Sequence, residues 1–505
     1  MEVVEDMEEL EMENLTSGTI IPFSEVTILT ALVFALVVIR GTSLLYFKYV
    51  QNAAIQKKKN VTLVVLGDIG RSPRMQYHAL SFSRNGWHVD FVGYDGSTPM
   101  TAITDNKNIK IHHISHPWRL PEFFPKILFL LYAPIKVYAQ MLTLYWTLLW
   151  RINSPDFVLV QNPPSIPTLL IVQFVVWLRQ TNLIVDWHNF GYTILALRLG
   201  EDNSVVKFAK WHEKVWGRRA VAHLTVTAAM HRELLYKWEV DGKVATLYDR
   251  PPQHFRRLEL DEIHEFFSRI NLEDIITLQS TGSSTFLTDS SSDSSTLFTH
   301  KPSPQEPARF RSDRPILIVS STSWTADEDF SILLRAAQKF DEVAKSGGAK
   351  TFPKLLFVIT GNGPLKEKYM QDISRLPLQH VRIVTMWLTA EDYPLLLGSA
   401  DLGISLHKSS SGMDLPMKVV DMFGCGLPVC AVNFQCLDEL VRHNKNGLIF
   451  NDAEELAKQL IDLFADYPVN ASKLDSMREH IKDFQKERWD SNWDRVVLPI
   501  LSEED

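Results

Sequence analysis

Hydrophobic residues occur along the chain as short, mostly apolar runs separated by helix-length amphipathic stretches. Two sets of such runs predict strands that are buried on both faces of a sheet. The first set comprises residues 61–66, 89–94, 109–114, 157–161, 183–186 and 224–227. The second set comprises residues 315–320, 355–360, 381–386, 402–406, 428–432 and 447–450. This alternation predicts an α/β protein with two Rossmann-like domains that face a central cleft.

A different apolar stretch lies near the N-terminus. Residues 26–39 carry no charge, but a helix of that length spans only about 21 Å, less than a hydrocarbon core of roughly 30 Å. Reading through Arg40, whose charged end can reach the interface, extends the helix to residues 26–47. Residues 1–25 are acidic and basic residues follow the helix. We therefore expect an uncleaved signal-anchor helix, with residues 1–25 lumenal and the body cytosolic. A cleaved signal peptide is the alternative, but its basic start is missing.

Residues 127–150 form another long apolar segment, with one charge, Lys136, and several aromatic side chains. A membrane crossing here would separate the first strands of the N-terminal sheet from its later strands, so the sheet could not close. We therefore expect a helix in the cytosolic leaflet, with Tyr and Trp rings at the headgroups. A buried core helix is the alternative.

The remaining boundaries follow from composition. Among residues 280–299, thirteen of twenty are Ser or Thr, too few apolar groups to offset the entropy of ordering. We expect a largely disordered Ser-rich insertion at 256–312. It separates an N-terminal domain at 61–255 from a C-terminal domain at 313–480, which a C-terminal helix or tail at 481–505 follows.

The overall composition changes this picture little. The 505 residues are 45% hydrophobic and 22% charged, with a net charge of −8, which disfavours nucleic acid as a partner. The acidic excess lies in residues 1–25, and the remainder is formally neutral. The three cysteines, all between Cys425 and Cys436, form neither a disulfide framework nor a spaced zinc site. We assign no metal site.

In the C-terminal half, the candidate binding residues come directly after predicted strands. A GxGP sequence at residues 361–364 permits tight turning and close ligand approach. Residues 407–416, a Ser- and Gly-rich loop, lead into a helix, and free N–H groups at a helix start favour a diphosphate. Asp421, one to two turns further on, is positioned for ribose hydroxyls.

This order of motifs resembles the nucleotide-sugar domain of GT-B glycosyltransferases. Retaining members carry two glutamates eight residues apart at this place. The chain has Asp421 at the second position, but at the first it has Met413, with Asp414 next to it. The retaining pair is therefore not reproduced, which argues against a retaining α-mannosyltransferase.

Four longer motifs sharpen the resemblance. Residues 67–78, 186–192, 321–325 and 411–424 are similar to the chitobiosyldiphosphodolichol β-mannosyltransferases of the endoplasmic reticulum. The resemblance implies β-1,4 transfer of the first mannose from GDP-mannose to GlcNAc₂-diphosphate-dolichol on the cytosolic face, early in N-glycan assembly. It implies a single-pass protein of the endoplasmic reticulum membrane that binds no cofactor. Other mannosyltransferases of the dolichol pathway are candidate partners.

An α-linked donor and a β-linked product require inversion, and one in-line displacement needs a base for the acceptor hydroxyl. Strand ends facing the cleft select Asp68, Asp186 and His188. We expect Asp68 to be the base, because the loop after the first strand supplies it in several inverting GT-B families. His188 is the second candidate. In the alternative interpretations Asp68 only caps a helix and His188 only orients other groups.

The other expected contacts divide by substrate. Arg71 and Arg74 are candidates for the acceptor diphosphate, because guanidinium groups suit paired phosphate oxygens; solvated charges at a helix start are the alternative. Lys418 either compensates the leaving diphosphate or is simply exposed. The donor-binding set is expected to be Ser321, Ser323, Gly361, Gly363, His407, Ser411, Asp414, Lys418 and Asp421.

Two other functions compete. A non-catalytic scaffold for other glycosyltransferases would lose the polar groups of the cleft, yet Asp68, His188, Ser411 and Asp421 are present. A dinucleotide oxidoreductase would carry GxGxxG after the first strand. The loop at 67–70 instead reads Gly-Asp-Ile-Gly.

Overall fold

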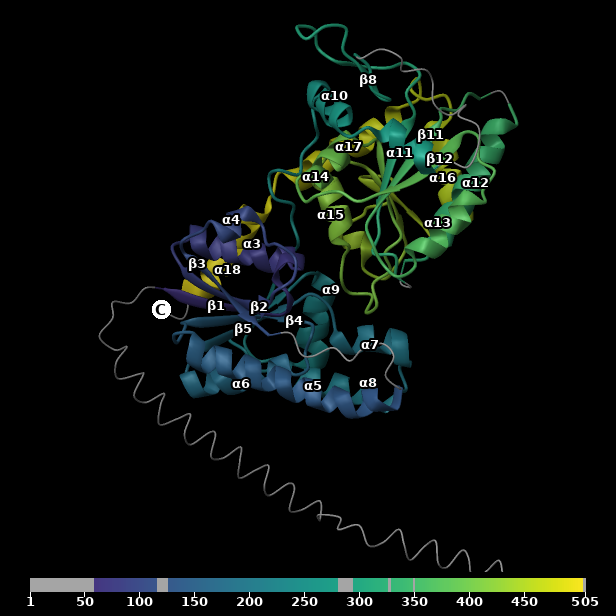
Figure 1. Ribbon diagram of the computed structural model, residues 1–505. Coiled ribbons are helices and arrows are strands. Elements are labelled where there is room, and N and C mark those ends of the chain that lie inside the picture. The colour runs from purple at the N-terminus through teal and green to yellow at the C-terminus, as the bar shows by residue number, and fades with distance from the viewer. Residues whose placement is uncertain (1–58, 116–125, 280–293, 326–327, 348–349, 503–505) are drawn as a thin grey trace, which may run out of the picture. The chain divides into compact units, whose positions relative to one another are not determined.

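The computed structural model describes residues 59–115, 126–279, 294–325, 328–347 and 350–502, which form two parallel sheets with helices on both faces (Figure 1). The N-terminal sheet has the order β3-β2-β1-β4-β5-β6-β7, and the C-terminal sheet has the order β12-β11-β10-β13-β14-β15. In each, the chain reverses its direction of travel across the sheet beside the first strand. Such switch points open a crevice at the carboxyl ends of the strands.

The first half contains the elements up to β7. Its strands are β1 (Asn60–Asp68), β2 (His88–Tyr94), β3 (Ile109–Ile114), β4 (Phe157–Asn162), β5 (Asn182–Trp187), β6 (Ala222–Thr225) and β7 (Lys243–Thr246). Its helices are η1 (Ile69–Arg71), α3 (Pro73–Arg84), α4 (Thr101–Thr104), α5 (Lys126–Trp146), η2 (Thr147–Arg151), α6 (Thr168–Arg179), α7 (Gly191–Leu199), α8 (Ser204–Gly217), α9 (Ala228–Arg232) and η3 (Glu233–Trp238).

The second half has the same construction. Its strands are β8 (Thr299–His300), β9 (Arg309–Phe310), β10 (Ile316–Ser321), β11 (Leu355–Thr360), β12 (Val381–Met386), β13 (Leu402–Ser405), β14 (Val429–Val432) and β15 (Gly447–Phe450). Its helices are α10 (Leu260–Arg269), α11 (Leu272–Gln279), α12 (Ser331–Lys345), α13 (Lys366–Ser374), α14 (Asp392–Ser399), α15 (Met417–Gly424), η4 (Leu437–Glu439), α16 (Ala453–Phe464), α17 (Ser472–Gln485) and α18 (Trp489–Ser502).

Every predicted apolar run coincides with a strand to within two residues at each end. Runs buried on both faces of a parallel sheet carry apolar side chains at consecutive positions, which is why the pattern finds them. The sequence prediction missed β7. This strand lies at the sheet edge, begins at an exposed lysine and is otherwise only half-buried, so it lacks an unbroken apolar run.

The last helix returns to the first half. Trp489 and Trp493 of α18 are buried in the core of the N-terminal sheet, where the ring of Trp493 lies edge-on to that of Phe82 at 4.9 Å between centroids. Figure 1 shows α18 on the same face of that sheet as α3 and α4, with α5–α8 on the other face. The boundary expected at residue 480 falls inside α17, so the C-terminal segment is a structural part of both halves.

The predicted disorder of residues 256–312 is wrong at both ends of this segment. Helix α10 buries Ile263, Phe266 and Phe267 on one side, and Phe298 packs against Phe267 at 4.5 Å between ring centroids. These apolar residues belong to a core cluster of the C-terminal half. The Ser and Thr residues that suggested disorder lie at 280–299, whereas α10 has a helical spacing of apolar residues of its own. The central residues 280–293 lie outside the described residues.

The expected leader at 1–25 and anchor helix at 26–47 also lie outside the described residues. The apolar segment at 127–150 is helical, as α5 followed by η2. Among the residues that the structure describes, no helix combines the length and the apolar character needed to cross a bilayer.

Candidate active site

A cleft of about 400 Å³ is lined by loops from both halves. The first half contributes the start of α3 and the loop after β5. The second half contributes the loop after β10 and the segment that leads into α15. The lining includes Arg71, Arg74, His188, Asn189, Asp249, Ser323, Glu328, His407, Asp414 and Lys418.

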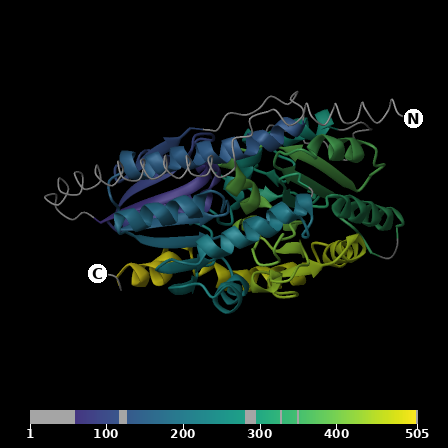
Figure 2. The same ribbon diagram turned by 90° about the horizontal axis from the view of Figure 1, so that it is seen from below.

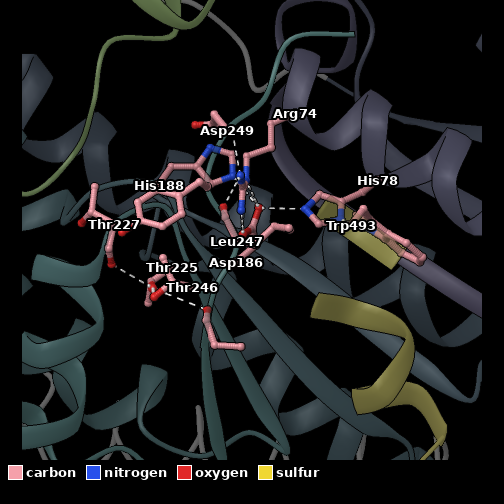
Figure 3. A network of polar contacts seen from close by, with 12 residues as sticks. Arg74, His78, Asp186, His188, Thr225, Thr227, Thr246, Leu247, Asp249 and Trp493 are labelled. Atoms are coloured by element: carbon pink, nitrogen blue, oxygen red, sulfur yellow. Dashed lines mark hydrogen bonds and ion pairs between the residues drawn. The ribbon is translucent and has the colours of Figure 1, made fainter. Parts of the chain in front are cut away.

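A buried carboxylate, Asp186 at the end of β5, is bonded to two residues of the cleft lining, Arg74 and His188 (Figure 3). Its two oxygens accept a bidentate pair of hydrogen bonds from Arg74, at 2.8 and 2.9 Å. Burial alone would raise the pKa of Asp186, but the charge and the hydrogen bonds of Arg74 hold it well below its usual range. Arg74 therefore favours the ionised form of Asp186.

A second partner of Asp186 is His78, whose Nε2 lies 3.2 Å from Asp186 Oδ2. The other ring nitrogen, Nδ1, accepts a hydrogen bond of 2.9 Å from the indole N–H of Trp493. Because an indole can only donate, Nδ1 carries no proton and Nε2 donates to the carboxylate. With a proton on Nε2 and none on Nδ1 this ring is neutral, and burial lowers the pKa of His78 in agreement.

The third partner, His188, lines the cleft. Its Nε2 lies 2.7 Å from Asp186 Oδ2, and 24% of its side chain is exposed, whereas Asp186 is fully buried. An ionised carboxylate can only accept, so Nε2 carries the proton. In the neutral ring Nδ1 is therefore the acceptor, as a general base requires.

Asp68, our expected base, has both carboxylate oxygens bonded to backbone N–H groups. Its Oδ1 accepts the N–H of Gly70 and its Oδ2 accepts the N–H of Ser97, both at 2.9 Å. Partial burial would raise the pKa of Asp68, but these hydrogen bonds and the charge of Arg71 lower it. Asp68 does not line the cleft. The cap interpretation fits this geometry, and a carboxylate with a lowered pKa is a weak base.

Arg74 and Arg71 differ in their exposure and in their hydrogen-bond partners. Arg74 is buried, and besides Asp186 it donates to Asp249 at 2.7 Å and to the carbonyl of Leu247 at 2.9 Å. Four of its five N–H donors are used within the protein, which disfavours the expected role of Arg74 in binding the acceptor diphosphate. Arg71 is exposed at the cleft, where its Nε donates to Ser97 Oγ at 3.0 Å; it remains a candidate.

On the second wall, Lys418 forms an ion pair with Glu328. Glu328 is buried and also accepts the N–H of Ser323 at 2.6 Å and the hydroxyl of Thr322. Lys418 is thus held in the cleft and is not simply exposed. Sequence analysis missed Glu328, because nothing in the acidic run at 327–329 distinguishes one residue from the others.

The loop before α15 folds around Asp414. The hydroxyls of Ser409 and Ser411 donate to Asp414, and His407 Nε2 lies 3.5 Å from its other oxygen. Gly412 has a φ of +72°, a conformation that favours glycine. His407, Asp414 and Lys418 line the cleft together with the start of α15, so the predicted loop and helix start lie at one place.

Three other predicted donor residues are not among the residues that line the cleft. Gly361 has a φ of +120°, and a Cβ there would lie 1.8 Å from the carbonyl oxygen of Thr322. A Cβ on Gly363 would lie 1.8 Å from the carbonyl oxygen of Ser323. The two glycines are therefore required by the close approach of the neighbouring backbone, and their predicted contact with the donor stays a prediction. Ser321 bonds to the hydroxyl of Tyr393 at 3.1 Å.

Asp421 also lies outside the cleft lining, on α15. No described residue donates a hydrogen bond to its carboxylate. Burial, with a further contribution from the charge of Asp249, raises its pKa well above the usual range. A desolvated carboxylate without donors is unfavourable unless a ligand supplies them.

The described residues contain no group of three or more His, Cys, Asp or Glu side chains positioned to hold a metal ion. The three cysteines are buried and unpaired with one another.

The chain is similar in sequence to known glycosyltransferases. Residues 314–466 match the family model of the group 1 glycosyl transferases. The chain is 46% identical to the UDP-glycosyltransferase TURAN of Arabidopsis thaliana, over 88% of this chain and 98% of that protein. It is also 46% identical to the chitobiosyldiphosphodolichol beta-mannosyltransferase of Mus musculus, over 88% of this chain and 90% of that protein. Its identity to the Homo sapiens protein of the same name is 43%, over 88% and 92%.

Solved structures share the fold at low identity. The Anabaena protein Alr3699/HepE, solved with UDP and glucose, matches with a TM-score of 0.56 at 14% identity, over 89% of this chain and 98% of that chain. The glycosyltransferase WaaG matches with a TM-score of 0.53 at 10% identity, over 87% of this chain and all of that chain. The two parallel Rossmann-like sheets are thus those of the GT-B fold.

Proposed function

The chain belongs to the family of the chitobiosyldiphosphodolichol β-mannosyltransferases, and from this premise we propose that its cleft transfers one mannose from GDP-mannose to GlcNAc₂-diphosphate-dolichol. The observation that carries the proposal is the chemistry of the two facing walls. One wall presents His188, with an acceptor nitrogen backed by an anion. The other presents Lys418 and the start of α15, which suit a departing diphosphate.

The reaction follows as one inverting displacement. The acceptor hydroxyl oxygen attacks the anomeric carbon of the α-linked mannose, the bond from that carbon to the diphosphate oxygen breaks, and a β-linkage forms. His188 Nδ1 takes the hydroxyl proton, and Asp186 stabilises the resulting imidazolium through Nε2. GDP leaves as an anion. His188 thus replaces Asp68 as the proposed base.

We assign the donor to the C-terminal wall. Lys418 and the free N–H groups at the start of α15 compensate the diphosphate, and Ser323, His407, Ser411 and Asp414 shape the loop around it. The ribose hydroxyls supply the hydrogen bonds that Asp421 lacks. The name of the Arabidopsis relative contains UDP, so the nucleotide base is the feature of the donor that most needs testing.

We assign the acceptor diphosphate to Arg71, the exposed guanidinium at the cleft. The lipid part of this acceptor requires a membrane, in agreement with the expected anchor at 26–47 in the endoplasmic reticulum. Residues 1–25 are then lumenal and the body cytosolic, where other mannosyltransferases of the pathway are candidate partners. Protease added to sealed microsomes should degrade the body; full protection would contradict this orientation.

The test of function is transfer with defined substrates. The purified full chain is incubated with lipid-linked chitobiose and either GDP-mannose or a UDP-sugar, and the product is digested with an anomer-specific β-mannosidase. We expect a single mannose, released by the β-enzyme, with GDP-mannose only. An α-linked product would indicate a retaining enzyme. Absence of transfer with any donor, by a chain that binds GDP, would favour the non-catalytic scaffold.

A further inference from the structure

Most of the large hydrophobic side chains that the described residues expose gather on α5, α6, α7 and α8. These helices cover one face of the N-terminal sheet, and Figure 2 turns that side of the molecule toward the viewer. The exposed side chains are Ile135, Tyr138, Leu142, Trp146, Trp177, Ile194, Leu197, Leu199, Val205, Phe208, Trp211 and Val215. Apolar clusters of this extent on a soluble surface mark an interaction site.

Helix α8 gives the clearest pattern. Val205, Phe208, Trp211 and Val215 recur at intervals of three or four residues and are each 43–55% exposed, so they form one outward stripe. The inward side of α8 is buried, including the carboxylate of Glu213, which accepts the N–H groups at the start of α7. Helix α8 therefore packs one face against the domain and leaves a second, apolar face exposed.

Helix α7 adds to the same surface. It has no fully buried residue, although Leu197 and Ile194 are large and apolar. It also begins at Gly191, three residues after His188. A partner that covers α7 would therefore contact a helix that begins only three residues after the proposed base.

The charges on this layer are mainly basic. Lys207, Lys210 and Lys214 alternate with the apolar stripe of α8, and all three are exposed. Lys207 lies 3.4 Å from Asp202, and Lys210 lies over the ring of Tyr192 at 5.0 Å from its centroid. Outside residues 1–25 the chain is formally neutral. A local excess of basic side chains on this layer therefore indicates an anionic partner.

Tryptophan and tyrosine beside lysine, on a partly apolar helical face, is the combination that binds the headgroup region of a membrane. A protein interface of this size would disfavour several lysines at its centre. We propose that the outer face of α5–α8 docks on the surface of a bilayer that contains anionic lipid. This inference deepens the proposed function, on which it rests for the membrane-borne acceptor: docking would keep the acceptor wall of the cleft beside the lipid.

The test uses the full chain in vesicles, with an environment-sensitive fluorophore at a single introduced cysteine. The three native cysteines are buried, so labelling is selective. Phe208→Cys reports the proposed face. The matched control is Val469→Cys, an exposed apolar position in the second half that is 94% exposed. Vesicles are made of phosphatidylcholine alone or with phosphatidylserine, with or without lipids that carry a quencher in the acyl chain.

We expect blue-shifted emission and quenching by the labelled lipid at position 208, strengthened by phosphatidylserine, and neither effect at position 469. Charge reversal of Lys207, Lys210 and Lys214 should remove the dependence on phosphatidylserine. Water-like emission at 208 would overturn the proposal. A blue shift without lipid quenching would do so as well, because it would indicate burial against protein.

A functional arm separates docking from chemistry. The double variant Phe208→Ser and Trp211→Ser should raise the KM for the vesicle-borne acceptor by about tenfold, because less apolar area enters the interface. Transfer to a short-chain, water-soluble acceptor should stay unchanged. An equal loss on both acceptors would contradict the docking role. Failure of the proposed function is distinguishable, since it would abolish transfer by the unaltered chain while leaving the fluorescence result intact.

Discussion

Replacing His188 by glutamine removes the ring nitrogen proposed to take the acceptor proton while leaving the network around it in place. The glutamine amide can still donate to Asp186 Oδ2, which His188 Nε2 reaches at 2.7 Å. The bidentate pair from Arg74 to Asp186 is untouched. We therefore expect His188→Gln to lower the free energy of unfolding by about 1 kcal/mol or less, the net worth of one hydrogen bond.

Its effect on transfer should be much larger. Loss of a general base slows the chemical step by roughly 10²–10⁴-fold, which equals about 3–5 kcal/mol in the activation free energy. Asp186→Asn should reduce both transfer and stability, because Asp186 stabilises the His188 imidazolium as well as pairing with Arg74. It leaves the buried Arg74 without its main anion, and breaking a buried ion pair costs about 3–5 kcal/mol of stability.

Asp68→Asn is the matched control on the neighbouring loop. It removes one of the two acceptors that bind Gly70 and Ser97, which should cost about 1 kcal/mol of stability and only a few-fold in transfer. The assays are single-turnover transfer, thermal unfolding, and GDP affinity by calorimetry. Near-normal transfer by His188→Gln would refute the assignment. Loss of transfer by Asp68→Asn in a fully stable protein would return the role of base to Asp68.

Four further sets of variants test the donor wall and the C-terminal core. Asp421→Asn should weaken GDP binding by about 1–3 kcal/mol, measured by calorimetry. It should also raise the melting temperature at neutral pH: burial raises the pKa of Asp421, so its ionised form destabilises the fold above that pKa, and this penalty disappears below the usual pKa of an aspartate. Lys418→Met should reduce both stability and transfer, and adding Glu328→Gln should restore the melting temperature but not transfer, because the buried carboxylate no longer needs a cation. A Gly/Ser linker of equal length in place of residues 280–293 should keep transfer within a few-fold, whereas Phe298→Ala should cost about 3–5 kcal/mol in denaturant unfolding because that ring is buried.

The sequence predicted the strands because each buried parallel strand is a local apolar run. The same reasoning placed the loop at 407–416 before a helix, and the structure has α15 there. It also selected His188 and Asp186 as neighbours at the end of one strand, although it ranked His188 below Asp68. Disorder was overestimated at 256–312, because the Ser- and Thr-rich composition of 280–299 was extended to a helix that has three buried apolar residues on one side.

The order of residues along the sequence thus determined the two sheets, the family resemblance and the loops that contain the candidate catalytic and binding residues. Tertiary structure decided which side chains in those loops are available. Arg74 is occupied by Asp186, 112 residues away, and His78 has its proton fixed by Trp493, 415 residues away. Lys418 meets Glu328 across 90 residues. A hydrogen bond depends on a separation of about 3 Å in space, and partners this distant in sequence leave no periodic pattern in it, so only the folded chain shows which charged groups are already paired and which can face a substrate.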